Sequence, residues 1–177
     1  KNMKRKVVKL LMAVIMICTS SAAFAWPDGE KKGLLLGVTT GIANEKYETD
    51  YSNESGLGFM AGALVGYGFN DSFLLDFKYR YWYADIDSTV FHTWSWCADG
   101  MFFPVKNNGF FLNAGLGRAL TLPDVSGAEA QGGMFFYAGA GYEITKWVFL
   151  SVDYGIGSYS NNIDGKTITF GISFIGY

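Results

Sequence analysis

Aromatic and charged side chains alternate along FLLDFKYRYWYAD, residues 73–85. The odd positions of its second half are aromatic: Phe77, Tyr79, Tyr81 and Tyr83. The even positions there include three charged residues: Asp76, Lys78 and Arg80. Successive side chains of a β-strand point to opposite faces, so this period of two predicts a strand with one aromatic and one charged face.

Turn residues divide the chain into eight segments with a similar alternation. These segments are 33–44, 56–69, 73–85, 93–103, 109–120, 132–144, 147–158 and 166–177. Each segment is long enough for a tilted strand to cross a bilayer, which takes about 9–11 residues. The sequence therefore predicts eight strands of membrane-spanning length.

The connections between these segments alternate in length. Tight turns are expected at 70–72, 104–108 and 145–146, and longer polar loops at 45–55, 86–92, 121–131 and 159–165. Acidic residues fall in or beside these loops: Glu45, Glu48, Asp50, Glu54, Asp85, Asp87, Asp124, Glu129 and Asp164. Short turns on one side and longer loops on the other are typical of outer-membrane barrels.

The second face of the strands separates a membrane barrel from a soluble β-sandwich. A sandwich would bury its apolar face and expose a face rich in long polar residues. Here the face opposite the apolar one is mostly glycine, alanine and serine, which suits a crowded interior. We therefore predict an all-β fold, an eight-stranded antiparallel up-and-down transmembrane β-barrel with both termini on the periplasmic, short-turn side.

Charged side chains in mid-strand positions belong in the lumen on this interpretation. On the lipid face, Lys78 would cost roughly 2–4 kcal/mol. Buried charges are tolerated when they are paired and hydrogen-bonded. The predicted lumen charge network, with Asn113 as a neutral partner, is Asp76, Lys78, Arg80, Asp99, Glu143 and Asp153.

Large inward residues are expected to lie against glycines of other strands. The large residues include Met60, Leu64, Phe111, Tyr137 and Phe149. The glycines are Gly58, Gly62, Gly66, Gly115, Gly139, Gly155 and Gly171. Such complementarity fills a narrow cylinder, so the sequence predicts a lumen closed by side chains and no stable aqueous pore.

Aromatic residues gather at both ends of the strands. Those beside the 86–92 loop are Tyr81, Trp82, Tyr83, Trp94 and Trp96, and Trp147 lies beside a short turn. The predicted aromatic girdle comprises Tyr81, Tyr83, Trp94, Trp96 and Trp147, since two such girdles bracket the apolar band of these barrels. Arg118 shares the lipid-facing side of its strand with Leu112 and Leu116. There it would reach lipopolysaccharide phosphates; the alternative is that a bulge turns it inward.

The first 25 residues have the pattern of a secretory signal peptide. Lys4, Arg5 and Lys6 form a basic head, an apolar stretch follows at 10–18, and Ala23-Phe24-Ala25 is a cleavage site. The expected domains are a signal peptide, 1–25, and an outer-membrane β-barrel, 26–177. The exported chain keeps Cys97 alone, so no internal disulfide is expected.

Composition and candidate chemistry exclude several function classes. The net charge of −2 among 177 residues gives no basic surface for nucleic acid. One histidine, His92, and one mature cysteine do not make a zinc site, so neither a metal nor another cofactor is expected. Ser158-Tyr159-Ser160-Asn161 is similar to a lipid A deacylase motif, with serine where that motif has histidine. The prediction is therefore a protein that is not an enzyme, without catalytic residues.

The mature chain resembles the small eight-stranded outer-membrane barrels, the OmpA-like, OmpX-like and OmpW-like group. The resemblance rests on the signal peptide, the eight alternating strands and the C-terminal FGISFIGY. It implies insertion by the barrel-assembly machinery, and outer-membrane lipids and lipopolysaccharide as partners. The expected role is structural or surface-interacting; the alternatives are a lipid A acyl hydrolase and a channel or transporter for small hydrophobic solutes.

Overall fold

The computed structural model describes residues 31–48, 53–86, 89–105, 108–125, 127–160 and 163–176. The predicted signal peptide, 1–25, lies outside these residues, as do Asp50 and Asp87 of the expected acidic loops. In the described part of the chain, no helix is long and apolar enough to cross a membrane.

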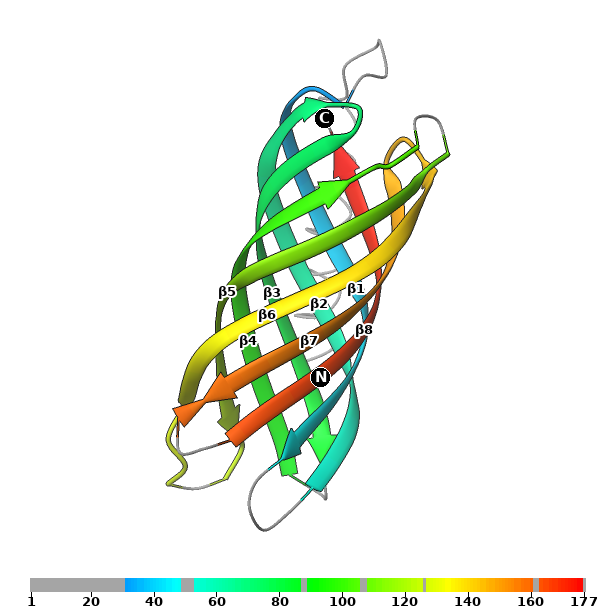
Figure 1. Cartoon of the computed structure of the whole chain (residues 1–177). Coiled ribbons are helices and arrows are strands. Elements are labelled where there is room, and N and C mark those ends of the chain that lie inside the picture. The colour runs from blue at the N-terminus through cyan, green and yellow to red at the C-terminus, as the bar shows by residue number, and fades with distance from the viewer. Residues whose placement is uncertain are drawn as a thin grey trace, which may run out of the picture.

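Eight antiparallel strands close into a barrel in which each strand pairs with its neighbours in sequence and β1 pairs with β8 (Figure 1). The strands are β1 Gly33–Glu48, β2 Asn53–Asn70, β3 Phe73–Ile86, β4 Thr89–Phe102, β5 Phe110–Pro123, β6 Gln131–Thr145, β7 Val148–Tyr159 and β8 Ile163–Gly176. The predicted fold class and number of strands are confirmed. Closure leaves no exposed sheet edge, which a bilayer requires because it offers no water to unpaired backbone groups.

The described ends of the chain lie at the same end of the barrel as the short turns. The Lys31 backbone N–H donates to Asp71 Oδ1 at 3.1 Å, and the Ile175 N–H donates to the Trp147 carbonyl at 2.9 Å. In Figure 1 this short-turn end is at the top, where β1 begins and β8 ends. The opposite end carries the other connections.

Those other connections are shorter than expected, and this prediction was wrong. The ladder between β1 and β2 continues to Glu48 and Asn53, and the ladder between β3 and β4 continues to Ile86 and Thr89. Backbone pairing satisfies N–H and C=O groups whether or not the side chains are apolar, so polar residues can extend a strand beyond the bilayer. Glu45, expected in a loop, therefore lies within β1.

The lumen contains two separate clusters of buried apolar side chains. The cluster near the short turns comprises Leu35, Leu64, Leu74, Met101, Phe103, Phe111, Phe149 and Ile175. The cluster toward the other end includes Met60, Trp82, Phe135, Tyr137 and Tyr159. Gly115 shows how the rings fit, because a Cβ there would lie 2.3 Å from the Tyr137 ring. Large and small residues thus interdigitate, as the sequence predicts.

The outer face carries the apolar side chains of the opposite parity. On β3, Phe77 and Tyr79 are 51% and 42% exposed, whereas Lys78 between them is 8% exposed. The same alternation of buried and exposed positions runs along the central parts of the other strands. An apolar outside around a partly charged inside is the arrangement of a membrane barrel.

Candidate functional site

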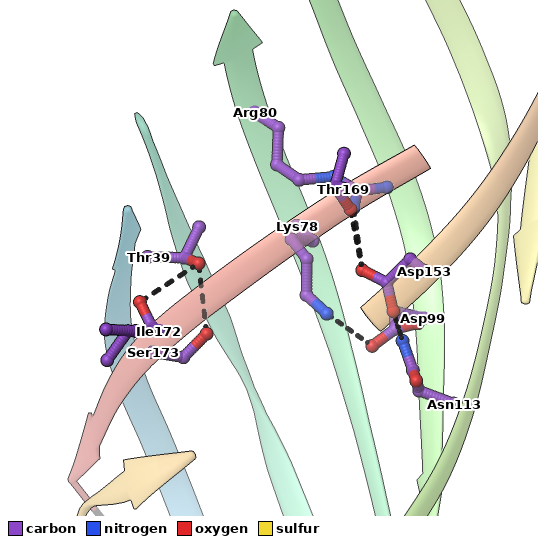
Figure 2. Close-up of polar contacts among 9 residues, drawn as sticks. All are labelled: Thr39, Lys78, Arg80, Asp99, Asn113, Asp153, Thr169, Ile172 and Ser173. Atoms are coloured by element: carbon purple, nitrogen blue, oxygen red, sulfur yellow. Dashed lines mark hydrogen bonds and ion pairs between the residues drawn. The ribbon is translucent and has the colours of Figure 1, made fainter. Parts of the chain in front are cut away.

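A layer of paired charges crosses the lumen between the two apolar clusters. Lys78 Nζ on β3 contacts Asp99 Oδ2 on β4 at 2.8 Å (Figure 2). Arg80 Nη1, two residues further along β3, contacts Asp153 Oδ2 on β7 at 3.1 Å. All four residues are buried, and together they form what we call the charge layer. Each cation in it therefore has a carboxylate partner from another strand.

Asp153 is the most connected member of the charge layer. Asn113 Nδ2 on β5 donates to its Oδ1 at 2.7 Å, and the Thr169 hydroxyl on β8 donates to its Oδ2 at 3.4 Å (Figure 2). The Arg80 guanidinium also lies 3.9 Å from the centroid of the Tyr137 ring. A single carboxylate thus joins β3, β5 and β8 to β7 through the middle of the barrel.

Asp76 lies beside the charge layer without joining it. Its Cα is directly opposite that of Asp99 in the β3–β4 ladder, and its side chain is buried. Neither carboxylate oxygen has a hydrogen-bond partner among the described residues. Like charges directly opposite each other on one face of a ladder repel, so Asp99 repels the Asp76 carboxylate while the Lys78 ammonium attracts it.

Glu143 lies apart from the other predicted network residues. Its Oε2 contacts Lys31 Nζ at 2.6 Å, and the same ammonium lies 3.7 Å from the centroid of the Phe103 ring. These residues are at the short-turn end, where the Glu143 N–H donates to the Gly109 carbonyl at 2.8 Å. Of the six predicted residues, the structure joins Lys78, Arg80, Asp99 and Asp153 in two ion pairs, and places Asp76 and Glu143 outside them.

A second buried polar group was missed by sequence reasoning. Glu45 is fully buried, and the Thr93 hydroxyl lies 3.3 Å from each of its carboxylate oxygens. The Tyr47 hydroxyl lies 3.1 Å from Thr93 Oγ1 and 2.7 Å from Thr121 Oγ1. We call Glu45, Tyr47, Thr93 and Thr121 the hydroxyl network. The alternation of faces along β1 could have indicated them, because Glu45 and Tyr47 share the face of Gly41 and Ala43, which points into the lumen.

The predicted girdle residues lie on the outer face. Tyr83, Trp96 and Trp147 are 42%, 36% and 47% exposed, and Tyr81 and Trp94 are half-buried. The Tyr81 hydroxyl is 2.7 Å from His92 Nδ1, and the rings of Tyr81 and Trp94 pack 5.7 Å apart. Trp82, expected among these aromatics, is instead 1% exposed in the lumen, because it shares the parity of Lys78 and Arg80.

Arg118 lies on the outer face of β5, exposed. Its Cα partners are Trp96 on β4 and Met134 on β6, and both ladders run through this position without a bulge. The alternative that a bulge turns Arg118 inward was wrong. In the part of the chain that the structure describes, no carboxylate forms an ion pair with its guanidinium.

A groove of about 380 Å³ lies over β5, β6, β7 and β8, and Met134 in its lining is the Cα partner of Arg118. Its lining residues are Leu116, Met134, Phe135, Phe136, Ile156, Gly157, Ser158, Asp164, Gly165 and Lys166. The lumen hollow lined by Lys78, Asn113 and Phe149 is far smaller, about 10 Å³. Of these two spaces, the larger lies on the outside of the barrel.

Catalytic and metal-binding arrangements are not assembled from the described residues. No group of three or more histidine, cysteine or carboxylate residues there is placed to hold a metal ion. His92 contacts Tyr81 on the outer face, whereas Ser95, the nearest serine along β4, is fully buried in the lumen. Ser158 lies on β7, which does not pair with the strand of His92.

Comparison with known proteins gives the family. A model described as the outer membrane protein beta-barrel domain matches residues 10–175. The Ail attachment invasion locus protein of Yersinia pestis is 14% identical, with a TM-score of 0.63 over 80% of this chain and 98% of that one. Neisserial surface protein A is 19% identical, with a TM-score of 0.58 over 81% and 99%.

A third solved structure, the outer membrane protein OprG from Pseudomonas aeruginosa, is 11% identical, with a TM-score of 0.51 over 84% of this chain and 99% of that one. These identities show a shared fold alone. No curated protein sequence matches the chain. The match to the family model covers nearly the whole chain, and the chain belongs to the outer membrane protein beta-barrel domain family, whose members lie in the bacterial outer membrane.

Proposed function

We propose that this protein is a structural or surface-interacting component of the bacterial outer membrane, that its lumen is closed by side chains, and that it is not an enzyme. The observation that carries the proposal is the charge layer between two apolar clusters. A conducting pore needs a continuous path for water. Here the Arg80 side chain reaches across the lumen to Asp153 on β7, and Lys78 is held by Asp99 on the neighbouring strand β4.

The small size of the lumen hollow beside the charge layer supports closure at that level. The hollow beside Lys78 and Asn113 has about 10 Å³, and a cavity needs about 10–15 Å³ on this measure to hold one water molecule. Phe149 lines this hollow, Tyr137 and Trp82 belong to the apolar cluster on the other side of the charge layer, and each of the three is at most 2% exposed. A steady aqueous column would require several of these side chains to move together.

The orientation of the barrel follows from its two ends. The described ends of the chain share one end of the barrel, where two of the three connections, 71–72 and 146–147, have only two residues. We assign this end to the periplasm, because bacterial barrels have short periplasmic turns. The opposite end, where the β1–β2 and β3–β4 ladders continue through polar residues, then extends outside the cell. Its exposed acidic residues, including Glu54, Asp85, Asp124 and Glu129, would face an extracellular partner.

The partners in the membrane are its lipids, and the barrel-assembly machinery during insertion. Arg118 is exposed on the outer face near Trp94 and Trp96 of the girdle, at the height expected for lipid headgroups. Its guanidinium is suited to bidentate contact with a lipopolysaccharide phosphate. The runner-up functions are a lipid A acyl hydrolase, which would need His92, and a channel for small hydrophobic solutes.

Planar-bilayer recording of the purified, refolded protein tests the closed lumen. We expect no steady single-channel conductance from the wild-type barrel, whose folding is first established by its heat-dependent mobility on an SDS gel. The double variant Phe135→Ala/Tyr137→Ala removes two buried rings and serves as the opened control. Steady unitary currents from folded wild-type protein would contradict the proposal and favour the channel.

A further inference from the structure

The groove on the outer face lies between two rows of side chains that run across the sheet. Successive Cα partners form one wall: Leu116, Phe136, Ile156 and Lys166. The next row of outward residues forms the other: Arg118, Met134, Ser158 and Asp164. All but Arg118 line the groove, and Arg118 stands at its edge, beside Met134.

The floor of the groove is backbone between these rows. Phe135, Gly157 and Gly165 are Cα partners in one row and point inward, where the Tyr159 ring lies against both glycines. The floor is therefore closed toward the lumen by a buried aromatic ring. The hollow opens only toward the lipid-facing side of the barrel.

The walls are apolar along most of their length. Leu116, Met134, Phe136 and Ile156 are 56%, 57%, 44% and 46% exposed. Three spacings between neighbouring strands, each about 4.8 Å, make the groove about 14 Å long from Leu116 to Lys166. An extended hydrocarbon chain fits such a shape, and Met134 can adapt to it because its side chain is unbranched.

Cations stand at the end of the groove on β8. Lys166 lines it, and its Cα partner on β1 is Lys46, which has the same outward parity. Asp164 is the one acid in the lining and opposes them. Neither ammonium needs to be free of protein partners, because each carries three donors and can share them with a bound anion.

We propose that this groove is a binding site for one acyl chain of an anionic membrane lipid, with the lipid phosphate held at Lys166 and Lys46. The apolar walls match the chain, and the two lysines at one end match the anion. Lys46 is two residues before the end of β1 and Lys166 three residues after the start of β8, so both lie close to the end of the barrel opposite the described chain ends. That end is where a phosphate headgroup of the outer leaflet would be found.

The inference specifies the lipid partner of the proposed function, and it rests on the barrel spanning the outer membrane. It does not rest on the closed lumen. A conducting wild-type barrel would contradict the closed-lumen proposal and would leave the proposal of lipid binding in the groove standing. A lack of lipid selectivity would contradict lipid binding in the groove and would leave the closed-lumen proposal standing.

Native mass spectrometry of the barrel in mixed micelles measures lipid retention directly. The probes are lipid A with its phosphates, dephosphorylated lipid A, phosphatidylglycerol and zwitterionic phosphatidylcholine. We expect the anionic lipid of each pair to be retained in preference to its counterpart, lipid A over dephosphorylated lipid A and phosphatidylglycerol over phosphatidylcholine. The two anionic probes, lipid A with its phosphates and phosphatidylglycerol, distinguish a lipopolysaccharide source from a phospholipid source.

Four variants separate charge from shape. Lys166→Gln should lower retention of the anionic lipid about fivefold, the effect of one lysine near a charged headgroup. Lys146→Gln, an exposed lysine in the turn at the opposite end, is the matched control and should have no effect. Asp164→Asn should raise retention, and Ser158→Trp, which fills the groove without changing charge, should lower it.

Heat-dependent gel mobility establishes that each variant is folded before its lipid is measured. Equal retention of the anionic lipids and their uncharged or zwitterionic counterparts by the wild type would overturn the proposal. Equal losses in Lys166→Gln and Lys146→Gln would overturn it as well, since the effect would then be general charge. Unchanged retention in folded Ser158→Trp would show that the lipid does not occupy the groove.

Discussion

The charge layer and the hydroxyl network bury carboxylates in two different ways. In the charge layer, Asp99 and Asp153 each contact a cation, Lys78 or Arg80. In the hydroxyl network, Glu45 is fully buried, and its described side-chain hydrogen bonds come from Thr93. One region compensates burial with opposite charge, and the other compensates it with neutral donors.

The difference determines what each region loses when one partner is removed. Removing one member of a buried ion pair leaves an uncompensated charge in the interior, which costs about 3–5 kcal/mol. Removing a neutral hydroxyl from a buried acceptor costs less, about 1–3 kcal/mol. The charge layer should therefore be the more sensitive region, although it need not stabilise the barrel more than an apolar layer would.

Lys78→Ala should have the largest effect. It leaves Asp99 buried without its cation, so we expect the free energy of unfolding to fall by about 3 kcal/mol. Denaturant unfolding of the refolded barrel in detergent measures this change. Lys146→Ala, in an exposed turn, is the control and should unfold like the wild type. An unchanged midpoint for Lys78→Ala would mean that Asp99 is hydrated and that the lumen is open to water.

Thr93→Val tests the hydroxyl network, and its effect should be smaller. The substitution keeps the branched shape and removes the hydroxyl that contacts Glu45, Tyr47 and Thr121. We expect a loss of about 2 kcal/mol in the same unfolding experiment. A loss as large as that of Lys78→Ala would show that the two regions are equally sensitive and would remove the distinction between them.

The sequence predicts the barrel well because its period of two is long and repeated. Phe77 and Lys78 could be assigned to opposite faces from their neighbours alone, since a charge on the lipid face is costly. The strand ends were less predictable, because the ladder continues through polar residues such as Lys46 and Glu48. Hydrophobicity indicates where a bilayer begins and ends, but backbone pairing does not stop there.

The partners of the buried charges were harder to predict than their direction. Parity places Asp76, Asp99 and Asp153 inward, but the choice of Asp99 for Lys78 depends on the register and on the curvature of the closed sheet. Arg80 contacts Asp153 across the lumen, on a strand with which β3 does not pair. Such a contact arises from barrel closure, which no local pattern encodes.

Asp76→Asn should have the smallest effect and the opposite sign. Asp76 is buried directly opposite Asp99 and has no hydrogen-bond partner among the described residues, so its carboxylate carries a burial penalty and a repulsion that the nearby Lys78 offsets only in part. An amide of the same shape removes that repulsion, and we expect the barrel to gain about 0.5 kcal/mol, within the range for cross-strand pairs. Asp99→Asn is the matched control, since it changes the opposite residue in the same way but weakens the Lys78 ion pair, and it should destabilise. Asp76→Asn could instead destabilise the barrel in denaturant unfolding. That result would show that Asp76 stabilises the cations of the charge layer, which would then contain three carboxylates instead of two.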